Sequence, residues 1–341
     1  MKRREYEEAS QCEMFDSAHN NIIFLRKMIK LTPDYSTTRL VTREVPVIEE
    51  PPDAAFKTVL SLPEGEGRQG EGGLRTQGYF KRSLPDKPLI TVITVVFNGA
   101  QHLEETILSV IGQTYDNVEY IIIDGGSTDG TLDIIRQYGH VIDYWVSEKD
   151  GGIYDAMNKG ITLSLGKSIG IINSDDWYEL STLSEIANNR EIDKNIFHGD
   201  MNIYKDGVYY YTQIFPGSFK SINKGMILSH PAMFVGKSIY KKFGYFDTSY
   251  RVAADWDMAL RLYKSGCMFH YKKQIFSNFR IGGISYKVDF KSSLEKSAIR
   301  KKNNIFYCID RYLLIDRIKI LILGTNVSLF SLFQKKLFSR L

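Results

Sequence analysis

A continuous, mostly β-branched run at residues 89–97 constrains the fold of this chain more than any other sequence feature. Such a run is typical of a strand buried on both faces of a parallel sheet. Apolar residues then recur at helical spacing between Leu103 and Ile111. Further strands are expected at 118–123, 142–146 and 168–172, and further helices at 131–138 and 153–165. This alternation predicts a doubly wound α/β sheet with ligands at the carboxyl ends of its strands.

The rest of the chain has a less regular pattern. A short helix is expected around 22–30, a hairpin at 203–211 that turns on Asp206 and Gly207, and an apolar helix at 255–264. The hairpin and the second helix should extend the sheet and complete a cleft.

A glycine-rich, polar segment precedes the first strand and contains a G-x-G-x-x-G pattern at Gly65, Gly67 and Gly70. In a dinucleotide site this pattern opens a helix whose N-terminus receives a pyrophosphate. Here glutamates flank the glycines and would repel the anion, and no helical periodicity follows. The segment is therefore expected to be a linker rather than a nucleotide-binding loop.

The charge of the chain is unevenly distributed. The formal net charge is +4, but residues 287–341 hold twelve Lys and Arg against four Asp and Glu, so the remainder is net −4. A basic tail indicates an anionic partner, either a membrane or a nucleic acid. Its apolar residues favour an amphipathic segment lying on a membrane and argue against nucleic acid, while no apolar stretch is long enough to span. A helix packed on the domain is the alternative.

The cysteines and the N-terminus predict a cellular location. Cys12, Cys267 and Cys308 lie far apart, which suggests neither a disulfide framework nor a thiolate zinc site. No apolar segment follows the first basic residues, so a cleaved signal peptide is not expected. These features fit a cytoplasmic protein, peripheral to the inner face of the cell membrane if the tail binds there.

Acidic residues follow the predicted strands. Asp124 ends the second strand, and Asp175 and Asp176 follow the strand at 168–172. Carboxylates repel a bare phosphate but suit Mg²⁺ or Mn²⁺, which binds one or two of them and fills its remaining positions with phosphate and water. The alternative for this motif is a turn and helix cap, a role that Asp and Ser also favour.

Four motifs in order, at residues 89–98, 121–131, 151–160 and 173–177, resemble those of family 2 glycosyltransferases. The resemblance covers roughly residues 86–285. It implies a GT-A fold, Rossmann-like and mostly parallel, with a nucleotide-sugar donor, a divalent metal and inversion at the anomeric carbon. It divides the chain into an N-terminal extension (1–62), a linker (63–85), a nucleotide-sugar half (86–180), an acceptor half (181–285) and a basic amphipathic helical tail (286–341).

The resemblance also implies roles for individual residues. Asp176 would bind the metal, and Asp124 would receive the nucleotide base. The residues expected to bind the nucleotide-sugar are Thr94, Val96, Asn98, Asp124, Ser127, Asp150, Gly152, Asp155, Asn158 and Asp175. Asp124 could instead only form a turn, and Asp155 and Asn158 could form a solvated helix face.

Two residues of the second half are candidates for catalysis. Residues 251–262 resemble the second acidic motif of the family, with Ala254 in place of a Glu, so Asp255 is the candidate base; its alternative role is helix capping. Asp257 is expected to be an ordinary first-turn acid. His230 matches a histidine near the diphosphate or acceptor, and a structural role is the alternative.

Together these features predict an inverting transferase that moves a sugar, with UDP as the default nucleotide, onto an acceptor hydroxyl. The resemblance points to a lipid-linked saccharide acceptor in O-antigen, capsule or exopolysaccharide synthesis. A sugar-phosphate nucleotidyltransferase is one alternative, although the basic glycine-rich loop that it would need after the first strand is missing. A catalytically inactive nucleotide-sugar-binding protein is the other.

Overall fold

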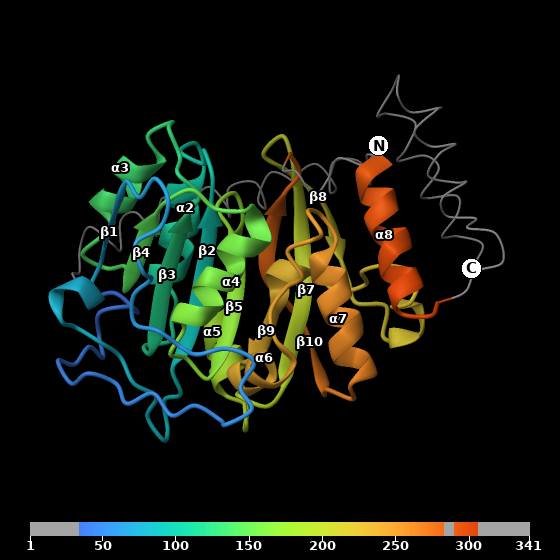
Figure 1. Ribbon diagram of the computed structural model, residues 1–341, viewed down its shortest axis with the longest axis horizontal. Coiled ribbons are helices and arrows are strands. Elements are labelled where there is room, and N and C mark those ends of the chain that lie inside the picture. The colour runs from blue at the N-terminus through green and yellow to red at the C-terminus, as the bar shows by residue number, and fades with distance from the viewer. Residues whose placement is uncertain (1–33, 283–289, 306–341) are drawn as a thin grey trace, which may run out of the picture.

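The computed structural model describes residues 34–282 and 290–305, so the helix expected at 22–30 lies outside the described part. Ten strands of these residues form one mixed sheet (Figure 1). The strands are β1 (Gly70–Gly72), β2 (Ile90–Val96), β3 (Val118–Asp124), β4 (Tyr144–Ser147), β5 (Ser168–Asn173), β6 (Trp177–Tyr178), β7 (Ile196–Lys205), β8 (Val208–Gln213), β9 (Met233–Gly236) and β10 (Phe269–Arg280). Their order is β1-β4-β3-β2-β5-β9-β7-β10-β6, and β8 pairs with β7.

The strands β4, β3, β2 and β5 form the parallel centre of the sheet. Every residue of β2 and β3 is buried, which explains why these strands are almost entirely apolar and β-branched. The sheet continues through antiparallel pairs to β9 and β7, so its second half is mixed. The predicted mostly parallel α/β sheet with an added second half is confirmed.

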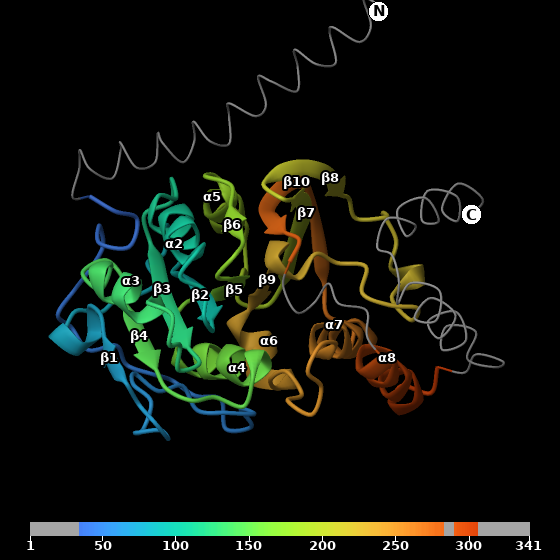
Figure 2. The same ribbon diagram turned by 90° about the horizontal axis from the view of Figure 1, so that it is seen from above.

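Helices cover both faces of the sheet (Figure 2). They are α2 (Leu103–Ile111), α3 (Thr131–Gln137), α4 (Ile153–Leu163), α5 (Thr182–Ala187), α6 (Lys237–Phe243), α7 (Ala254–Lys264) and α8 (Phe290–Lys302). Apolar side chains of α2, α3 and α5 pack on one face, and those of α4, α6 and α7 on the other.

The predicted hairpin is present between β7 and β8. Asp206 and Gly207 both have positive φ, 51° and 78°, the conformation of a two-residue turn that matches strand twist. Asp–Gly is a favoured pair for this turn because Gly has no Cβ to clash.

The stretch expected to be a linker contributes a strand instead. β1 lies within residues 63–85 and pairs antiparallel with β4, Gly70 opposite Ser147 and Gly72 opposite Trp145. The prediction rested on the lack of side chains to bury, but an edge strand is held by its backbone hydrogen bonds. The wider division of the chain into domains stays a prediction.

Two buried ion pairs join this N-terminal stretch to the sheet. Arg75 Nη2 lies 2.5 Å from Glu119 Oε1, and Lys81 Nζ lies 2.9 Å from Asp143 Oδ2. All four side chains are at most 3% exposed. Glu119 belongs to β3, and Asp143 directly precedes β4. Arg75 and Lys81 both precede β2. The N-terminal stretch therefore neutralises acids inside the α/β core.

The first part of the expected amphipathic tail packs on the domain. Glu295 of α8 accepts hydrogen bonds from the backbone N–H groups of Arg251, Val252 and Ala253, at 2.8, 2.9 and 3.1 Å. Ile299 is fully buried in the core. Residues 306–341 lie outside the described part. Among the residues that the structure describes, no helix is long and apolar enough to cross a membrane.

Candidate active site

The loops that follow β2 and β3 are joined by hydrogen bonds at the carboxyl edge of the sheet. Asn98 N donates to Ser127 Oγ at 2.7 Å, and Thr128 N donates to Asn98 Oδ1 at 2.9 Å. Gly125 N donates to Val96 O at 2.9 Å. Asn98 adopts a positive φ of 51°, which its short side chain tolerates. These bonds bring Asn98, Ser127 and the backbone of Val96 together, and their contact with a nucleotide stays a prediction.

Asp124 lies at the centre of this region and is fully buried. Its carboxylate accepts hydrogen bonds from both the backbone and the hydroxyl of Ser127, and from Ser147 Oγ at 2.6 Å. Both oxygens are therefore engaged in shaping the turn. The turn-forming role left open by the sequence is present, and contact with a nucleotide base stays a prediction.

Thr94 does not face this edge. It is fully buried, and its hydroxyl shares a hydrogen bond of 3.0 Å with the Tyr120 hydroxyl inside the apolar layer. The side chain of Val96 is also buried in that layer. The alternation of a strand explains both positions, because residues two apart point to the same face. Val96 can thus approach a ligand only through its backbone.

The loop before α4 is organised by carboxylates. Asp150 Oδ1 accepts from Gly152 N at 2.8 Å, and Asp155 Oδ2 accepts from Gly151 N at 3.0 Å. Gly152 has a φ of 114°, which requires glycine. Burial raises the pKa of Asp150. The predicted residues Asp150, Gly152 and Asp155 therefore lie together in one turn.

Asn158 has a different environment from the one that the sequence suggested. Its amide donates to Phe246 O and accepts from Phe246 N, both at 3.0 Å. This pairing uses one donor and the acceptor of the side chain to fasten α4 to a loop of the second half. Asn158 is thus a partly buried link between the halves, and its contact with ribose or sugar hydroxyls stays a prediction.

The acidic motif after β5 contains two unequal carboxylates. Asp176 is fully buried, and its Oδ1 accepts from Arg280 N at 3.0 Å. Asp175 is partly buried, and burial raises its pKa. The pKa of Asp176 is raised well above its ordinary value, first by burial and then by the neighbouring charge of Asp175. Two adjacent acids with raised pKa values favour binding of a proton or a cation.

The donor atoms of this motif fit a hard divalent cation. Asp176 Oδ2 and Asn173 Oδ1 are both buried oxygens that accept no hydrogen bond within the described part of the chain. Buried polar atoms normally have partners, so these two oxygens call for a ligand. No cluster of three or more His, Cys, Asp or Glu side chains forms a metal cage among the described residues. A motif with few protein ligands suits a cation that also binds phosphate oxygens.

Arg280 completes the acidic motif and was not predicted. Its guanidinium donates to Asp175 O at 3.1 Å and to Glu105 Oε2 at 2.8 Å, and lies 4.7 Å from the Trp177 ring centroid. The residue comes from the end of β10, more than a hundred positions along the chain. No sequence pattern marks it, because its role depends on the pairing of β10 beside β6.

The two predicted catalytic residues meet in one cavity of about 160 Å³. Asp255, His230, Tyr154 and Asn173 line it, together with Arg251 and several apolar side chains. Burial raises the pKa of Asp255, and His230 opposes that shift. Burial lowers the pKa of His230, so its neutral form is favoured. The cavity therefore holds a carboxylate and an imidazole next to Asn173, the last residue of β5.

Asp255 lies in the first turn of α7. Its Oδ1 accepts from Trp256 N at 2.8 Å, and the Tyr154 hydroxyl lies 3.5 Å away, at the limit of a hydrogen bond. The helix cap is Ala253, and no side-chain hydrogen bond caps the helix from that position. Asp257, by contrast, is buried and pairs with Lys302 of α8 at 3.2 Å. Asp255 is therefore the acid of this pair that faces the cavity.

Known proteins resemble this chain in sequence and in fold. The model of "Glycosyl transferase family 2" matches residues 91–247. An uncharacterized glycosyltransferase of Mycobacterium tuberculosis is 31% identical over 183 residues, which cover 52% of this chain and 70% of that protein. The chain belongs to glycosyltransferase family 2. As a member of this family it is a glycosyltransferase, an enzyme class that differs from the nucleotidyltransferase alternative.

This family 2 glycosyltransferase also resembles other proteins in sequence or in fold. The PGL/p-HBAD biosynthesis glycosyltransferase of M. tuberculosis is 27% identical over 61% of this chain and 84% of its own length. The structure of S. aureus TarS 1–349 in complex with UDP-GlcNAc matches with a TM-score of 0.52 and 16% identity, over 62% of this chain and 64% of that one. GalNAc-T7 with UDP, GalNAc and Mn²⁺ matches with a TM-score of 0.50 and 12% identity, over 64% and 48%. At these identities the structures support the fold alone.

Proposed function

We propose that this glycosyltransferase moves a sugar from a UDP-sugar to an acceptor hydroxyl with inversion at the anomeric carbon. The observation that carries the proposal is the cavity in which Asp255 and His230 meet Asn173, next to the acidic motif. Inverting transfer needs a base on the acceptor side and charge stabilisation on the diphosphate side. In this site the base is Asp255, and His230 lies beside it to orient the acceptor hydroxyl.

The acidic motif is the proposed site of Mg²⁺ or Mn²⁺. The unpartnered oxygen of Asp176 would hold the cation, and Asp175, which lies nearer the surface, would hold the ribose or support the cation. The bound metal would neutralise charge on the departing diphosphate. The Mn²⁺ present with UDP in the structure of GalNAc-T7 supports this choice.

The donor would bind along the carboxyl edge, between the turns that hold Asn98, Ser127 and Asp150. The last of these turns carries the partly buried carboxylates of Asp150 and Asp155. Hydroxyl groups of ribose and sugar are suitable donors to such carboxylates. UDP is chosen because the structurally similar TarS binds UDP-GlcNAc.

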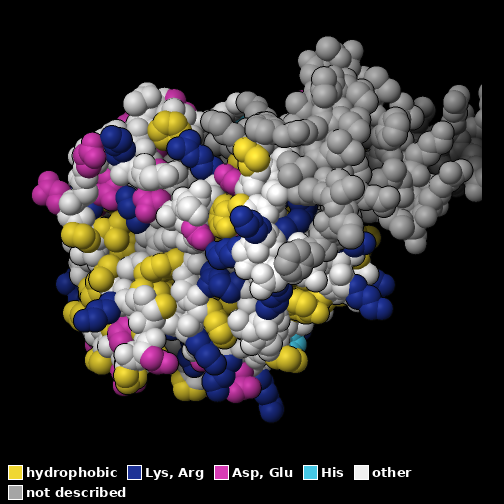
Figure 3. Space-filling view, turned by 45° about the vertical axis from the view of Figure 1, so that its right-hand side comes forward, with side chains coloured by type: hydrophobic (Ala, Val, Ile, Leu, Met, Phe, Trp, Pro, Cys, Tyr) yellow, Lys and Arg dark blue, Asp and Glu magenta, His cyan; other side chains and the backbone are white. Residues whose placement is uncertain are grey.

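The acceptor would be a lipid-linked saccharide presented at an anionic membrane surface. Figure 3 shows Lys and Arg side chains gathered over the centre and right of the face beside α7 and α8, with acidic side chains mostly to the left. The last turn of α8 adds Arg300, Lys301 and Lys302. A basic face on the acceptor half, followed by a basic tail, favours an anionic carrier. Such an acceptor is consistent with O-antigen, capsule or exopolysaccharide synthesis at the inner face of the cell membrane.

A calorimetric panel tests the donor assignment. The full chain is titrated with UDP, GDP, dTDP and CMP, each with Mn²⁺ and again with EDTA. Binding of UDP ahead of the others, and only with Mn²⁺, is the expected result. A chain that binds none of the four would contradict the proposal, and binding that ignores EDTA would contradict the metal.

A further inference from the structure

Residues 62–72, here called the strap, lie beside the proposed donor site although they precede the residues that match the family model. The strap runs along the outer edge of β4. Gln69 N donates to Ser147 O at 2.8 Å, and Lys149 N donates to Glu66 O at 3.2 Å. Since Ser147 ends β4, the strap reaches the same carboxyl edge as the Asp124 turn.

The glycines of the strap serve close packing against β4. A Cβ on Gly65 would lie 2.2 Å from Glu148 Oε2, and one on Gly72 would lie 2.8 Å from the Trp145 ring. Real Cβ atoms essentially never make contacts that short, so a larger residue at position 65 would displace Glu148, and one at position 72 would clash with the Trp145 ring. The glycine-rich pattern therefore places the strap and binds no pyrophosphate itself.

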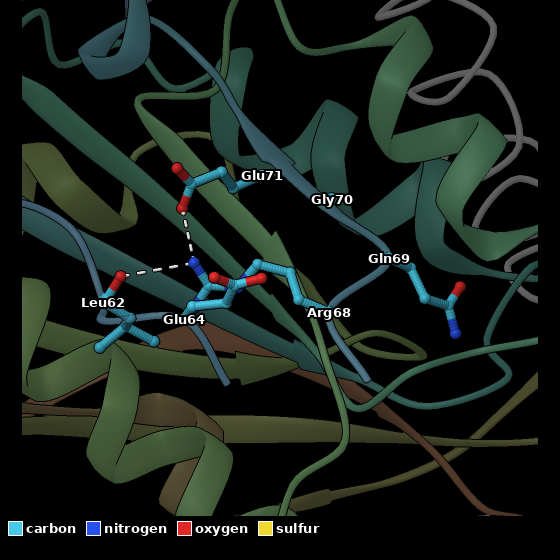
Figure 4. Close-up of a pocket in the computed structure, with 6 residues that line it drawn as sticks. All are labelled: Leu62, Glu64, Arg68, Gln69, Gly70 and Glu71. Carbon is cyan, nitrogen blue, oxygen red and sulfur yellow. Dashed lines mark hydrogen bonds and ion pairs between the residues drawn. The ribbon is translucent and has the colours of Figure 1, made fainter. Parts of the chain in front are cut away.

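Arg68 fixes the position of the strap. Its guanidinium donates to Glu148 Oε2 at 2.7 and 2.9 Å, and to the carbonyl oxygens of Leu62 and Pro63. Glu148 is only 4% exposed and also pairs with Lys159 of α4 at 2.8 Å. A hollow of about 490 Å³ lies between these strap residues (Figure 4). The strap is thus tied to the helix that follows the Asp150 turn.

Gln69 is the strap residue that faces the turn after β3. In Figure 4 its side chain extends away from the group formed by Arg68, Leu62 and Glu71. A Cβ on Gly126 would lie 3.7 Å from Gln69 Nε2. On the other side of the same turn, a Cβ on Gly125 would lie 2.7 Å from Asp150 Oδ2. Gln69 and Asp150 therefore flank the two glycines that follow Asp124.

The amide of Gln69 is exposed and makes no hydrogen bond within the described part of the chain. It differs in this from Asp124, whose two oxygens are engaged by Ser127 and Ser147. An amide offers a donor and an acceptor side by side. Uracil and thymine both present the complementary pair, a carbonyl oxygen next to a ring N–H, whereas guanine presents it on a larger ring, farther from the ribose.

We propose that Gln69 selects the base of the nucleotide donor by pairing its side-chain amide with the edge of uracil. This inference rests on the proposed function, because it requires the donor at the carboxyl edge. A site that hydrogen-bonds a ligand edge discriminates strongly, since a wrong base leaves polar groups unpaired. The strap would then give the chain a base preference that residues 91–247 do not determine alone.

The test compares nucleotide affinities of three variants with those of the unmodified full chain. Dissociation constants for UDP, GDP, dTDP and CMP are measured with Mn²⁺ in Gln69→Ala, in Gln69→Glu, and in the control Gln137→Ala, which removes an exposed glutamine at the far end of α3. We expect the constants for UDP and dTDP, which share this edge, to rise about tenfold in Gln69→Ala, the loss of roughly one hydrogen bond. They should rise further in Gln69→Glu, which removes the donor and adds a charge. Constants for purine nucleotides should change little.

A preference for UDP over GDP that is the same in both Gln69 variants and the unmodified chain would overturn the inference. An equal loss of affinity for all four nucleotides would also overturn it. That result would indicate that the strap is displaced and that Gln69 does not select the base. Failure of the unmodified chain to bind any nucleotide would instead count against the proposed function. Circular dichroism melting of each variant shows whether the fold is kept.

Discussion

Replacing Glu295 with alanine removes the three hydrogen bonds that hold the residues before α7. The carboxylate accepts from Arg251, Val252 and Ala253 at 2.8 to 3.1 Å, and Asp255 follows two residues later. A hydrogen bond to a charged group contributes about 1.5–3 kcal/mol, but Arg251 is exposed and water can replace Glu295 there. Loss of a helix cap costs about 0.5–2 kcal/mol. We therefore expect Glu295→Ala to lower the free energy of unfolding by about 2–3 kcal/mol.

The same change should slow catalysis more than it weakens donor binding. A shift of about 1 Å at a reacting group can reduce the rate by about 10²-fold, so kcat should fall at least tenfold if the start of α7 moves. Donor affinity should stay within about twofold, because the Asp124 and Asp150 turns do not touch α8. Glu295→Gln keeps one carbonyl oxygen. Its kcat and its free energy of unfolding should therefore lie between those of Glu295→Ala and those of the unmodified chain.

Denaturant unfolding and steady-state kinetics, measured well below the melting temperature, check this prediction. Lys301→Ala is the matched control, since Lys301 is exposed on the same helix. An unchanged kcat in Glu295→Ala, with a clear loss of stability, would show that the cap supports the fold without positioning Asp255. Unchanged stability would refute the energetic reasoning itself.

Four further predictions concern the metal, the base and the tail. Asp176→Asn should keep the fold, because an amide oxygen can still accept from Arg280 N. It should remove most Mn²⁺-dependent UDP binding, because one carboxylate ligand of the cation is lost. If calorimetry finds this UDP binding intact, Asp176 is not the metal ligand. Asp255→Asn should lower kcat by about 10²- to 10⁴-fold with donor affinity retained, and near-normal turnover would leave Asp255 only a structural role. Burial raises the pKa of Asp255, and a base must be deprotonated to act. The kcat/KM of the unmodified enzyme should therefore fall as the pH drops through a value above about 3.9, the ordinary pKa of Asp. A pH profile that stays flat down to about pH 4 would contradict this prediction. A chain ending at residue 305 should bind anionic vesicles more weakly than the full chain in a sedimentation assay, and equal binding would remove the tail from the membrane proposal.

Elements that bury many apolar side chains were predictable from the sequence, and elements held by backbone contacts were not. The apolar runs of β2 and β3 are typical of strands in a sheet buried on both faces. β1, in contrast, is three residues with two glycines, and its pairing with β4 leaves no trace in hydrophobic periodicity. The composition of the strap indicated only that it could not fold alone.

The candidate site likewise contains residues that the sequence predicted and residues that it did not. The motifs around Asp124, Asp150 and Asp176 follow strands, so their meeting at one edge was predictable from topology. Asn158 was assigned to ligand binding because helical spacing places it near Asp155. Its actual partner is the backbone of Phe246, 88 residues further along the chain, and no local pattern encodes such a contact. Arg280 and Glu295 escaped prediction for the same reason.

The buried ion pairs of the N-terminal stretch set a limit on how small a working version of this enzyme can be. A chain cut at residue 86, where the sequence alone places the start of the catalytic domain, would lose both Arg75 and Lys81. Glu119 and Asp143 would then remain inside the sheet without counter-charges. Removing one partner of a buried pair costs about 3–5 kcal/mol, and two such losses approach the whole stability of a typical domain. The region that defines the family is therefore not a module that could be exchanged alone between relatives. Any graft that keeps Glu119 and Asp143 must carry residues 75–81 with it.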